Sequence, residues 1–480
     1  MQDFETLLEQ CREKNRMVDL CIQSECSLTG HLDSLKDKRD MNNTVTPLRD
    51  DGDFILACSL YVEQRLGGEA AEEAAVALAQ RIVNTADHHG GFYSAQAFQG
   101  DLLFGELLRM LGYKGNSTPV LSFSHVELGN STYARGLCLY GSRYKRLLLP
   151  IQPKKDENRM VTLTASYDKG ALDRVRKLAA MPETGVSLRQ RKVLDKLLKE
   201  VYEDEKLLGI SRYADQLFHI GEKLSRHVFS DADRRILYIE GEEVLTPLFI
   251  RELEDESSLI YRIFYDERLR EAMNRISADG LALSQLLLRG ADEKGRRINV
   301  QLFPDGKIKG MDHRGRVAEY DSGPAELCRL LKARALIPAG FSAAVMLFFE
   351  RGITWLGGYF QSLYLPEWIS LFSQALSEAG FAREASLIAS YDGSGYISGP
   401  LYALDGGEGA ATPAGPAEFY EKPVTVTDLE RRLESCMLKD AHCMGLYEIY
   451  EDLVPASEKR EGWYEAIAEY CTGEYGGYLI

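Results

Sequence analysis

The stretch Pro119-Val120-Leu121-Ser122-Phe123-Ser124 decides the predicted fold class, because it is a short apolar run of strand length. A segment of helical composition, residues 95–111, precedes it, and Gly112 is placed to end that helix in a left-handed conformation. Three further segments have strand periodicity: 136–140, 147–151 and 160–165. Helices followed by clustered strands predict an α/β or α+β core over about residues 45–180.

The flanking regions are predicted to be mostly helical. Upstream, residues 69–84 are rich in alanine and glutamate, which are good helix formers, so one helix is expected to run through residue 84. Downstream, residues 186–280 are mainly helical but contain a short apolar strand at 235–240. The turn Pro304-Asp305-Gly306 lies between two alternating segments and predicts a β-hairpin.

These patterns predict a helix-rich, multi-domain chain with a mixed sheet in its N-terminal half and a mostly helical C-terminal half. Four parts are expected from changes in composition and from the glycine- and proline-rich stretches. They are a polar helical segment (1–44), an α/β domain with the candidate site (45–181), a helical domain with a β-hairpin insert (186–404) and C-terminal helices (417–480).

The overall charge argues against polyanionic partners. The 480 residues carry 57 basic and 73 acidic side chains, a net charge of −16, which repels nucleic acid and anionic lipid. The nine cysteines are scattered, with no C-x-x-C pair, which fits a reduced, cytoplasmic protein better than a disulfide-bonded one. We therefore expect a small-molecule substrate and no nucleic-acid or membrane partner, and we leave homo-oligomer formation open.

The densest group of reactive side chains lies in two short stretches, Asp87-His88-His89-Gly90-Gly91 and Ser124-His125-Val126-Glu127. Imidazoles and carboxylates transfer protons or bind metals, and glycine lets the backbone approach a ligand closely. The predicted catalytic residues are Asp87, His88, His89, His125 and Glu127. A divalent metal would also accept this mixed ligand set, so the cofactor is left open. The alternative is structural, with the histidine pair at a helix carboxyl end and His125 in the core.

A loop directly after the 119–126 segment is a candidate substrate cradle. Its backbone N–H groups, hydroxyls and one guanidinium suit a carboxylate or phosphate, and ligands of α/β folds bind at the carboxyl ends of strands. The predicted substrate-binding residues of this loop are Asn130, Ser131, Thr132 and Arg135. An ordinary turn is the alternative, because asparagine, serine and glycine are common turn residues.

The segment 355–368 is unusually aromatic, with six aromatic side chains around a Gly357-Gly358 break. Aromatic walls suit a flat or sugar-like ligand, and we predict that Arg351, Gln361 and Tyr364 contribute to substrate binding there. Tight packing between domains explains the same residues, because tryptophan and tyrosine are commonly found in cores and interfaces.

Two acidic motifs together resemble a known family. Asp51-Gly52-Asp53 followed by an apolar run, and then Asp87-His88-His89, is similar to the DHH phosphoesterases, whose aspartates and histidines hold manganese ions. The resemblance implies a metal-dependent phosphoesterase. In that family the triplet follows a hydrophobic strand, whereas the composition of residues 82–86 here predicts the continuation of a helix.

The sequence therefore predicts a cytoplasmic enzyme that acts on a small polar or anionic metabolite through a His/Asp/Glu cluster, with transferase or hydrolase chemistry. The first alternative is a non-catalytic binding or scaffold protein that uses the aromatic segment 355–368. The second alternative is the metal-dependent phosphoesterase.

Overall fold

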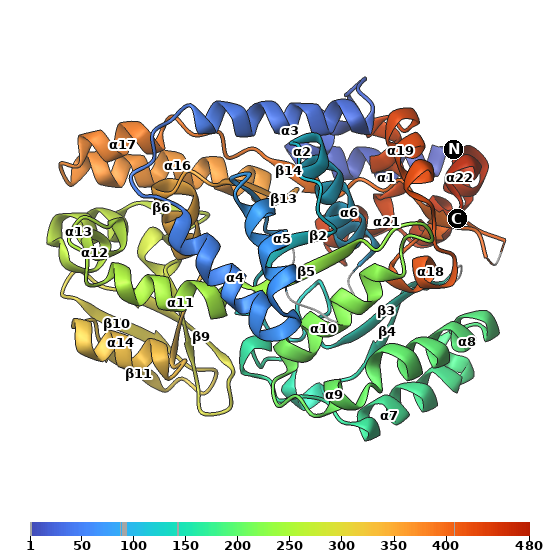
Figure 1. The fold of residues 1–480 in the computed structure, drawn as a ribbon, viewed down its shortest axis with the longest axis horizontal. Coiled ribbons are helices and arrows are strands. Elements are labelled where there is room, and N and C mark those ends of the chain that lie inside the picture. Colours follow the sequence, from blue (N-terminus) through green and yellow to red (C-terminus); the bar gives the residue numbers. More distant parts are fainter. Residues whose placement is uncertain (1, 87, 89–93, 142–143, 408) are drawn as a thin grey trace.

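The computed structural model describes residues 2–86, 88, 94–141, 144–407 and 409–480. The helix-rich α/β class predicted from the sequence is confirmed, with 54 % of the residues in helices and 17 % in strands. Both chain ends lie at the same end of the molecule (Figure 1), where the ring of Phe4 stacks on Tyr470 with 3.6 Å between centroids. Among the described helices, none has an apolar stretch long enough to cross a membrane.

A five-stranded parallel sheet, in the order β14-β13-β1-β2-β5, joins distant parts of the chain. Its strands are β1 (Ile82–Asn84), β2 (Ser117–Ser122), β5 (Arg235–Glu240), β13 (Thr354–Gly358) and β14 (Tyr396–Ser398). From β1 the chain adds β2 and β5 on one side, and later β13 and β14 on the other. The sheet is therefore doubly wound, and its strand order reverses between β1 and β13.

Both faces of this sheet are buried, because successive side chains of a strand point to opposite sides. Ile82 and Val120 belong to one hydrophobic core, whereas their neighbours Val83 and Leu121 belong to another. The first core contains α1 (Gln2–Lys14), α2 (Arg16–Ile22), α3 (Leu28–Asn43) and α6 (Ala95–Met110). The second contains α4 (Gly52–Leu66), α5 (Gly68–Leu78), α11 (Gly241–Glu252), α12 (Leu259–Tyr265), α13 (Glu267–Arg275), α16 (Gln361–Glu378) and α17 (Ala382–Ile388).

The connection between β2 and β5 has a hydrophobic core of its own. In it, β3 (Gly136–Gly141) pairs with β4 (Tyr144–Pro150) in antiparallel orientation. The helices of this part are α7 (Lys169–Ala180), α8 (Leu188–Leu197), α9 (Glu205–Leu208) and α10 (Tyr213–Arg226). They lie together at one corner of the molecule (Figure 1), so the connection forms a lobe beside the sheet.

The connection between β5 and β13 contains a second sheet, of five antiparallel strands in the order β11-β10-β9-β8-β12. They are β8 (Leu288–Ala291), β9 (Arg297–Leu302), β10 (Lys307–Met311), β11 (Val317–Asp321) and β12 (Leu336–Pro338). Short elements flank this sheet: β6 (Ser277–Ala278), β7 (Leu281–Ala282), α14 (Pro324–Lys332) and α15 (Gly340–Ala344). The hairpin predicted around Pro304-Asp305-Gly306 is confirmed as the β9–β10 pair.

The segment after β14 returns to the first core. Its elements are β15 (Leu404–Asp405), β16 (Thr412–Pro413), α18 (Pro416–Glu421), α19 (Val426–Ser435), α20 (Leu438–Met444), α21 (Leu446–Leu453) and α22 (Trp463–Glu474). Residues of these helices share a single hydrophobic core with α1, α2 and α3. The first and last parts of the chain therefore cover one face of the sheet together.

Two predicted elements are wrong. The helix expected through residue 84 ends earlier, because Arg81 adopts a positive φ of 58°, and residues 82–84 pair in parallel with β13 as strand β1. The strand expected at 160–165 is instead a short 3-10 turn at Val161–Leu163. The helix expected at 95–111 is confirmed as α6, and Gly112 follows it with a left-handed φ of 92°. The four domain boundaries drawn from the sequence stay predictions.

Two buried histidines hold α3 and α20 to strand β14. Nε2 of His31 donates to the carbonyl oxygen of Tyr396 at 2.8 Å, and Nδ1 of His442 donates to the carbonyl of Leu438 at 2.8 Å. The Tyr396 hydroxyl donates a hydrogen bond to Nε2 of His442 at 2.8 Å, because Nε2 of this neutral ring carries the lone pair. Burial lowers the pKa of both imidazoles to about 4.

Acidification should therefore destabilise the fold through His31 and His442. The unfolded chain takes up protons at these rings below pH ~6.5, whereas the folded chain takes them up only near pH ~4, so stability is lost as the pH falls between these values. At pH 5 each ring should cost about 2 kcal/mol of unfolding free energy. Urea denaturation at pH 7 and pH 5 measures this loss. An equal loss in the double variant His31→Gln/His442→Gln would contradict the assignment.

Candidate functional site

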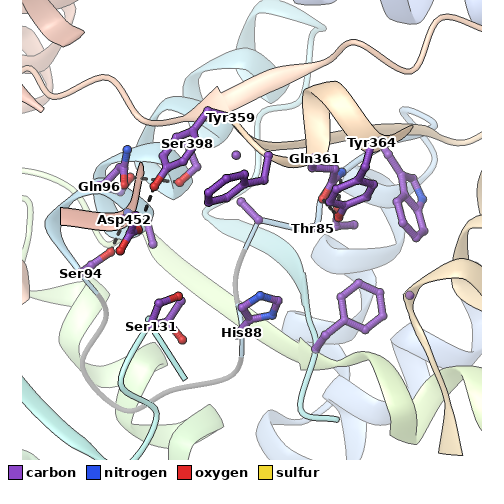
Figure 2. Close-up of a pocket in the computed structure, with 18 of the residues that line it drawn as sticks. Thr85, His88, Ser94, Gln96, Ser131, Tyr359, Gln361, Tyr364, Ser398 and Asp452 are labelled. Atoms are coloured by element: carbon purple, nitrogen blue, oxygen red, sulfur yellow. Dashed lines mark hydrogen bonds between the residues drawn. The ribbon is translucent and has the colours of Figure 1, made fainter. Parts of the chain in front are cut away.

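A cavity of about 370 Å³ opens at the carboxyl edge of the parallel sheet. Four of the five strands contribute to it: Thr85 and His88 follow β1, Phe123 and His125 follow β2, Tyr359 to Gln361 follow β13, and Ser398 ends β14. Figure 2 shows side chains from these positions on different sides of one space. The cavity spans the point where the strand order reverses, which is where doubly wound sheets bind their ligands.

His125 lies in the cavity wall and is held by Glu242, the second residue of α11. The Nδ1 atom of His125 is 2.5 Å from Oε1 of Glu242, and the backbone N–H of His125 donates to the same oxygen at 2.9 Å. Because a carboxylate only accepts, the neutral imidazole carries its proton on Nδ1 and keeps the lone pair on Nε2. This arrangement fixes both the tautomer and the orientation of the ring.

Glu242 itself is held from the end of β2. Ser124 donates to its Oε2 from the backbone N–H at 2.8 Å and from the hydroxyl at 2.7 Å. Burial alone would raise the pKa of Glu242, but the contacts from His125 and Ser124 outweigh burial and lower it to about 2. Gly241 permits this approach, since a Cβ there would lie 2.9 Å from the ring of Phe123. Glu242 is therefore an ionised partner for His125 at neutral pH.

A second buried carboxylate supports the first. Glu240, at the end of β5, is fully buried; its Oε1 accepts from the Thr162 hydroxyl at 2.6 Å and lies 2.8 Å from Oγ of Ser124. Nη2 of Arg212 donates to both of its oxygens, at 2.9 and 2.7 Å. The guanidinium of Arg212 compensates the buried carboxylate of Glu240. Glu240 in turn fixes the position of Ser124, and Ser124 fixes that of Glu242.

His88 also lines the cavity, beside β2. It forms an isolated parallel bridge with Phe123, and its ring faces the shared space (Figure 2). Its Nδ1 atom is buried and has no hydrogen-bond partner among the described residues. Burial, together with the nearby His125, lowers the pKa of His88 to about 4, so its imidazole is neutral at pH 7. A neutral ring offers a ligand one donor and one acceptor.

The opposite wall carries two acidic side chains one helical turn apart on α21. Glu448 is buried and accepts from the backbone N–H of Gln96 at 2.7 Å and from the Tyr140 hydroxyl. Asp452 is more exposed and accepts from the Tyr359 hydroxyl at 2.8 Å. Both side chains line the cavity, so the C-terminal helices take part in a site whose histidines follow β1 and β2.

Two of the residues predicted from the aromatic segment face the cavity. The hydroxyl of Thr85 contacts both amide atoms of Gln361, at 3.0 and 2.8 Å, and the Tyr364 hydroxyl lies 3.4 Å from Oε1 of Gln361. Figure 2 shows these three side chains on the same side of the space. Trp355 and Trp368 line the cavity as well, so much of the 355–368 segment faces the cavity.

Only two of the four loop residues predicted to bind the substrate line the cavity. Ser131 and Thr132 line the cavity, but Asn130 and Arg135 do not. Oδ1 of Asn130 accepts from the backbone and hydroxyl of Thr132 at 2.9 and 2.6 Å, which is the hydrogen bonding of an ordinary turn. Nη1 of Arg135 lies 3.6 Å from Glu157. These two side chains therefore stabilise the loop and are placed away from the cavity.

One more predicted residue lies outside the cavity wall, and two are not among the described residues. Oε1 of Glu127 lies 3.8 Å from Nε of Arg297, and Glu127 is not part of the cavity wall. Asp87 and His89 lie outside the described residues. Within the described part of the chain, no three His, Cys, Asp or Glu side chains are arranged to hold a metal ion, and the divalent metal stays a prediction.

Arg351 is placed at the other edge of the sheet, just before β13. It is fully buried and binds Asp53 through Nε at 3.0 Å and Nη2 at 2.8 Å. The same Nη2 lies 2.7 Å from Glu252. Its charge is neutralised within the core, so Arg351 cannot serve as the substrate ligand predicted from the sequence.

The described residues of the two motifs in the phosphoesterase resemblance lie at opposite edges of the parallel sheet. Asp51 lies 3.3 Å from Arg81, which precedes β1, and Asp53 binds Arg351. His88 follows β1, so the sheet lies between it and these aspartates. The strand that this family has before the triplet is present here as β1, but the first motif is not brought to the cavity.

Four charged cavity residues among those described were not predicted, namely Arg146, Arg289, Glu448 and Asp452, and neither was Glu242, the partner of His125. Two signals for them are present in the sequence. Glu242 follows directly on the strand predicted at 235–240, where the neighbouring carboxyl ends meet. Glu448 and Asp452 are four residues apart and therefore share a helix face. No protein-family model and no curated protein matches the chain.

Proposed function

We propose that the chain is an enzyme that binds a small polar or anionic molecule in the cavity and uses His125 as its general base. The 2.5 Å contact between His125 and Glu242, in a cavity wall at the carboxyl edge of the sheet, carries this proposal. A carboxylate that fixes the tautomer of an imidazole and stabilises its protonated form is the arrangement that acid–base enzymes use. Nε2 of His125 would take a proton from the substrate or from water.

The other polar groups of the cavity would orient the substrate. Neutral His88 offers one donor and one acceptor, and Gln361 is held by Thr85 so that its amide has a defined direction. Asp452 lies on the opposite wall, where it can accept a hydrogen bond from the substrate or pair with a cationic group of the substrate. This set suits proton transfer during transfer or hydrolysis reactions, which both require activation of a hydroxyl or an amine.

A metabolite screen tests the proposal. Two of the three tryptophans, Trp355 and Trp368, line the cavity, so a bound compound should change the intrinsic fluorescence. Each compound that binds is then incubated with the protein and analysed by mass spectrometry for a new product. We expect turnover of at least one compound. Binding without turnover of any compound would instead support the non-catalytic alternative.

A further inference from the structure

One cation in the cavity wall has no anionic partner among the described residues. Arg289, on β8, donates from Nη1 to the backbone carbonyls of Gln285 at 2.9 Å and Leu288 at 3.3 Å. Its Nε atom is buried and has no hydrogen-bond partner among the described residues. Glu448 and Asp452 share the same cavity, but no carboxylate of the described residues forms an ion pair with Arg289.

Two other arginines of the described residues, the fully buried Arg351 and the half-buried Arg212, are compensated. Arg351 binds Asp53 and Glu252, and Arg212 binds Glu240 and Glu243. Buried charges are paired in this way because water no longer solvates them. Burial and the nearby Arg297 lower the pKa of Arg289 to about 10, and the guanidinium is still charged at pH 7. Arg289 thus carries a positive charge that the described residues leave without a counter-ion.

Two further donors in the cavity wall lack partners. Trp355 is 2 % exposed and Gln96 is 6 % exposed, and Nε1 of the first and Nε2 of the second are buried without a hydrogen bond among the described residues. Buried donors are nearly always paired, so unpaired ones in a cavity wall indicate groups that a ligand completes. As far as the described residues go, these two N–H groups are left for the acceptor atoms of a ligand.

We infer that Arg289 binds the anionic group of the cavity's ligand, and that the substrate class is a small organic anion with a flat apolar body. The inference rests on the proposed function, since it assigns the substrate of the same cavity. A carboxylate or phosphate would supply both the missing charge and the missing acceptors. The flat body follows from the aromatic walls, where the rings of Tyr364 and Trp368 lie 4.5 Å apart and Phe341 meets Trp368 at 5.3 Å.

Simple probes test this assignment without knowledge of the substrate. Benzoate carries a flat ring and a carboxylate, benzamide is its neutral analogue, and inorganic phosphate is an anion without a ring. Binding is measured by tryptophan fluorescence. We expect benzoate to bind at least tenfold more tightly than benzamide, and Arg289→Met to weaken benzoate about tenfold to a hundredfold while benzamide is unchanged. Tighter binding of phosphate than of benzoate, also lost in Arg289→Met, would assign a phosphate group.

Control variants separate charge from folding. Arg289→Lys keeps the charge and should retain part of the affinity for benzoate. Arg297→Met removes the exposed guanidinium on the adjacent β9 and should leave benzoate binding within twofold of the wild type. Thermal unfolding of each variant reports whether the fold is intact. Unchanged benzoate affinity in a folded Arg289→Met protein would overturn the inference, and so would a wild type that binds neither anion.

The two assays separate this inference from the proposed function, because anion binding is measured without turnover. If the anion depends on Arg289 but no compound is turned over, the anion site stands and the enzymatic proposal fails. If turnover depends on His125 but Arg289→Met binds and converts the substrate normally, the enzymatic proposal stands and the anion site fails.

Discussion

Replacement of His125 by glutamine should lower kcat/KM for the cavity's substrate about a hundredfold to ten-thousandfold. Glutamine fills a similar space but cannot take up a proton, so the loss reports proton transfer and not the loss of a contact. Glu242→Gln should cause a loss of similar size, because an amide can present a donor to Nδ1 of His125 and favour the wrong tautomer. Steady-state kinetics with the compound found in the screen measures both effects.

A matched histidine completes this test. Glu242 has a pKa of about 2 and stays ionised, so His125 keeps the same charged partner over the neutral pH range of the assay. His313→Gln, which changes an exposed histidine, should keep the wild-type rate. Full activity in His125→Gln would remove the general base from the proposal.

Replacement of Arg351 by methionine should lower the free energy of unfolding by about 3–5 kcal/mol. The arginine side chain is fully buried between Asp53 and Glu252, and Glu252 is itself fully buried. Burial and the charge of Glu252 also raise the pKa of the adjacent Glu350 well above its ordinary value. Without the guanidinium, these carboxyl groups would be left in the core without a cation, which is strongly unfavourable. Urea denaturation at pH 7 measures the change.

Two companion variants show whether burial is the cause. Arg251→Met removes another cation that contacts Asp53, but this one is 54 % exposed, so its loss should cost less than about 1 kcal/mol. The double variant Arg351→Met/Glu252→Gln removes one buried charge of each sign and should recover part of the stability. A cost below 1 kcal/mol for Arg351→Met alone would show that the buried carboxyl groups are compensated in another way.

The sequence predicted the elements whose signal is local. The strand at 235–240, the helix ended by Gly112 and the hairpin around Pro304-Asp305-Gly306 all depend on residues close in the chain. Strands β1 and β14 have only three residues each, which is too short for a periodic pattern. β1 is stabilised by pairing with β13, more than 250 residues away. Such pairing is a tertiary effect that local composition does not encode.

The same limit applies to the site. The structure brings His88 and His125 to one cavity, and both lie in short polar stretches that residue type alone could identify. Arg289 and Asp452 come from parts of the chain that have no reactive pattern of their own, so their role depends on the fold. Arg351 shows the opposite error, because a charged residue near aromatic side chains was predicted to bind a ligand but is a buried ion pair.

The shared core of the first and last helices has a consequence for biosynthesis. Phe4 and Leu32 pack with residues as late as Tyr475, so their partners leave the ribosome more than 400 residues later. At about 5–20 residues per second, the part of the apolar surface of α1 to α3 that packs on these late residues stays uncovered for roughly 20–80 s. The first core of the sheet can therefore close only after the last helices have been synthesised.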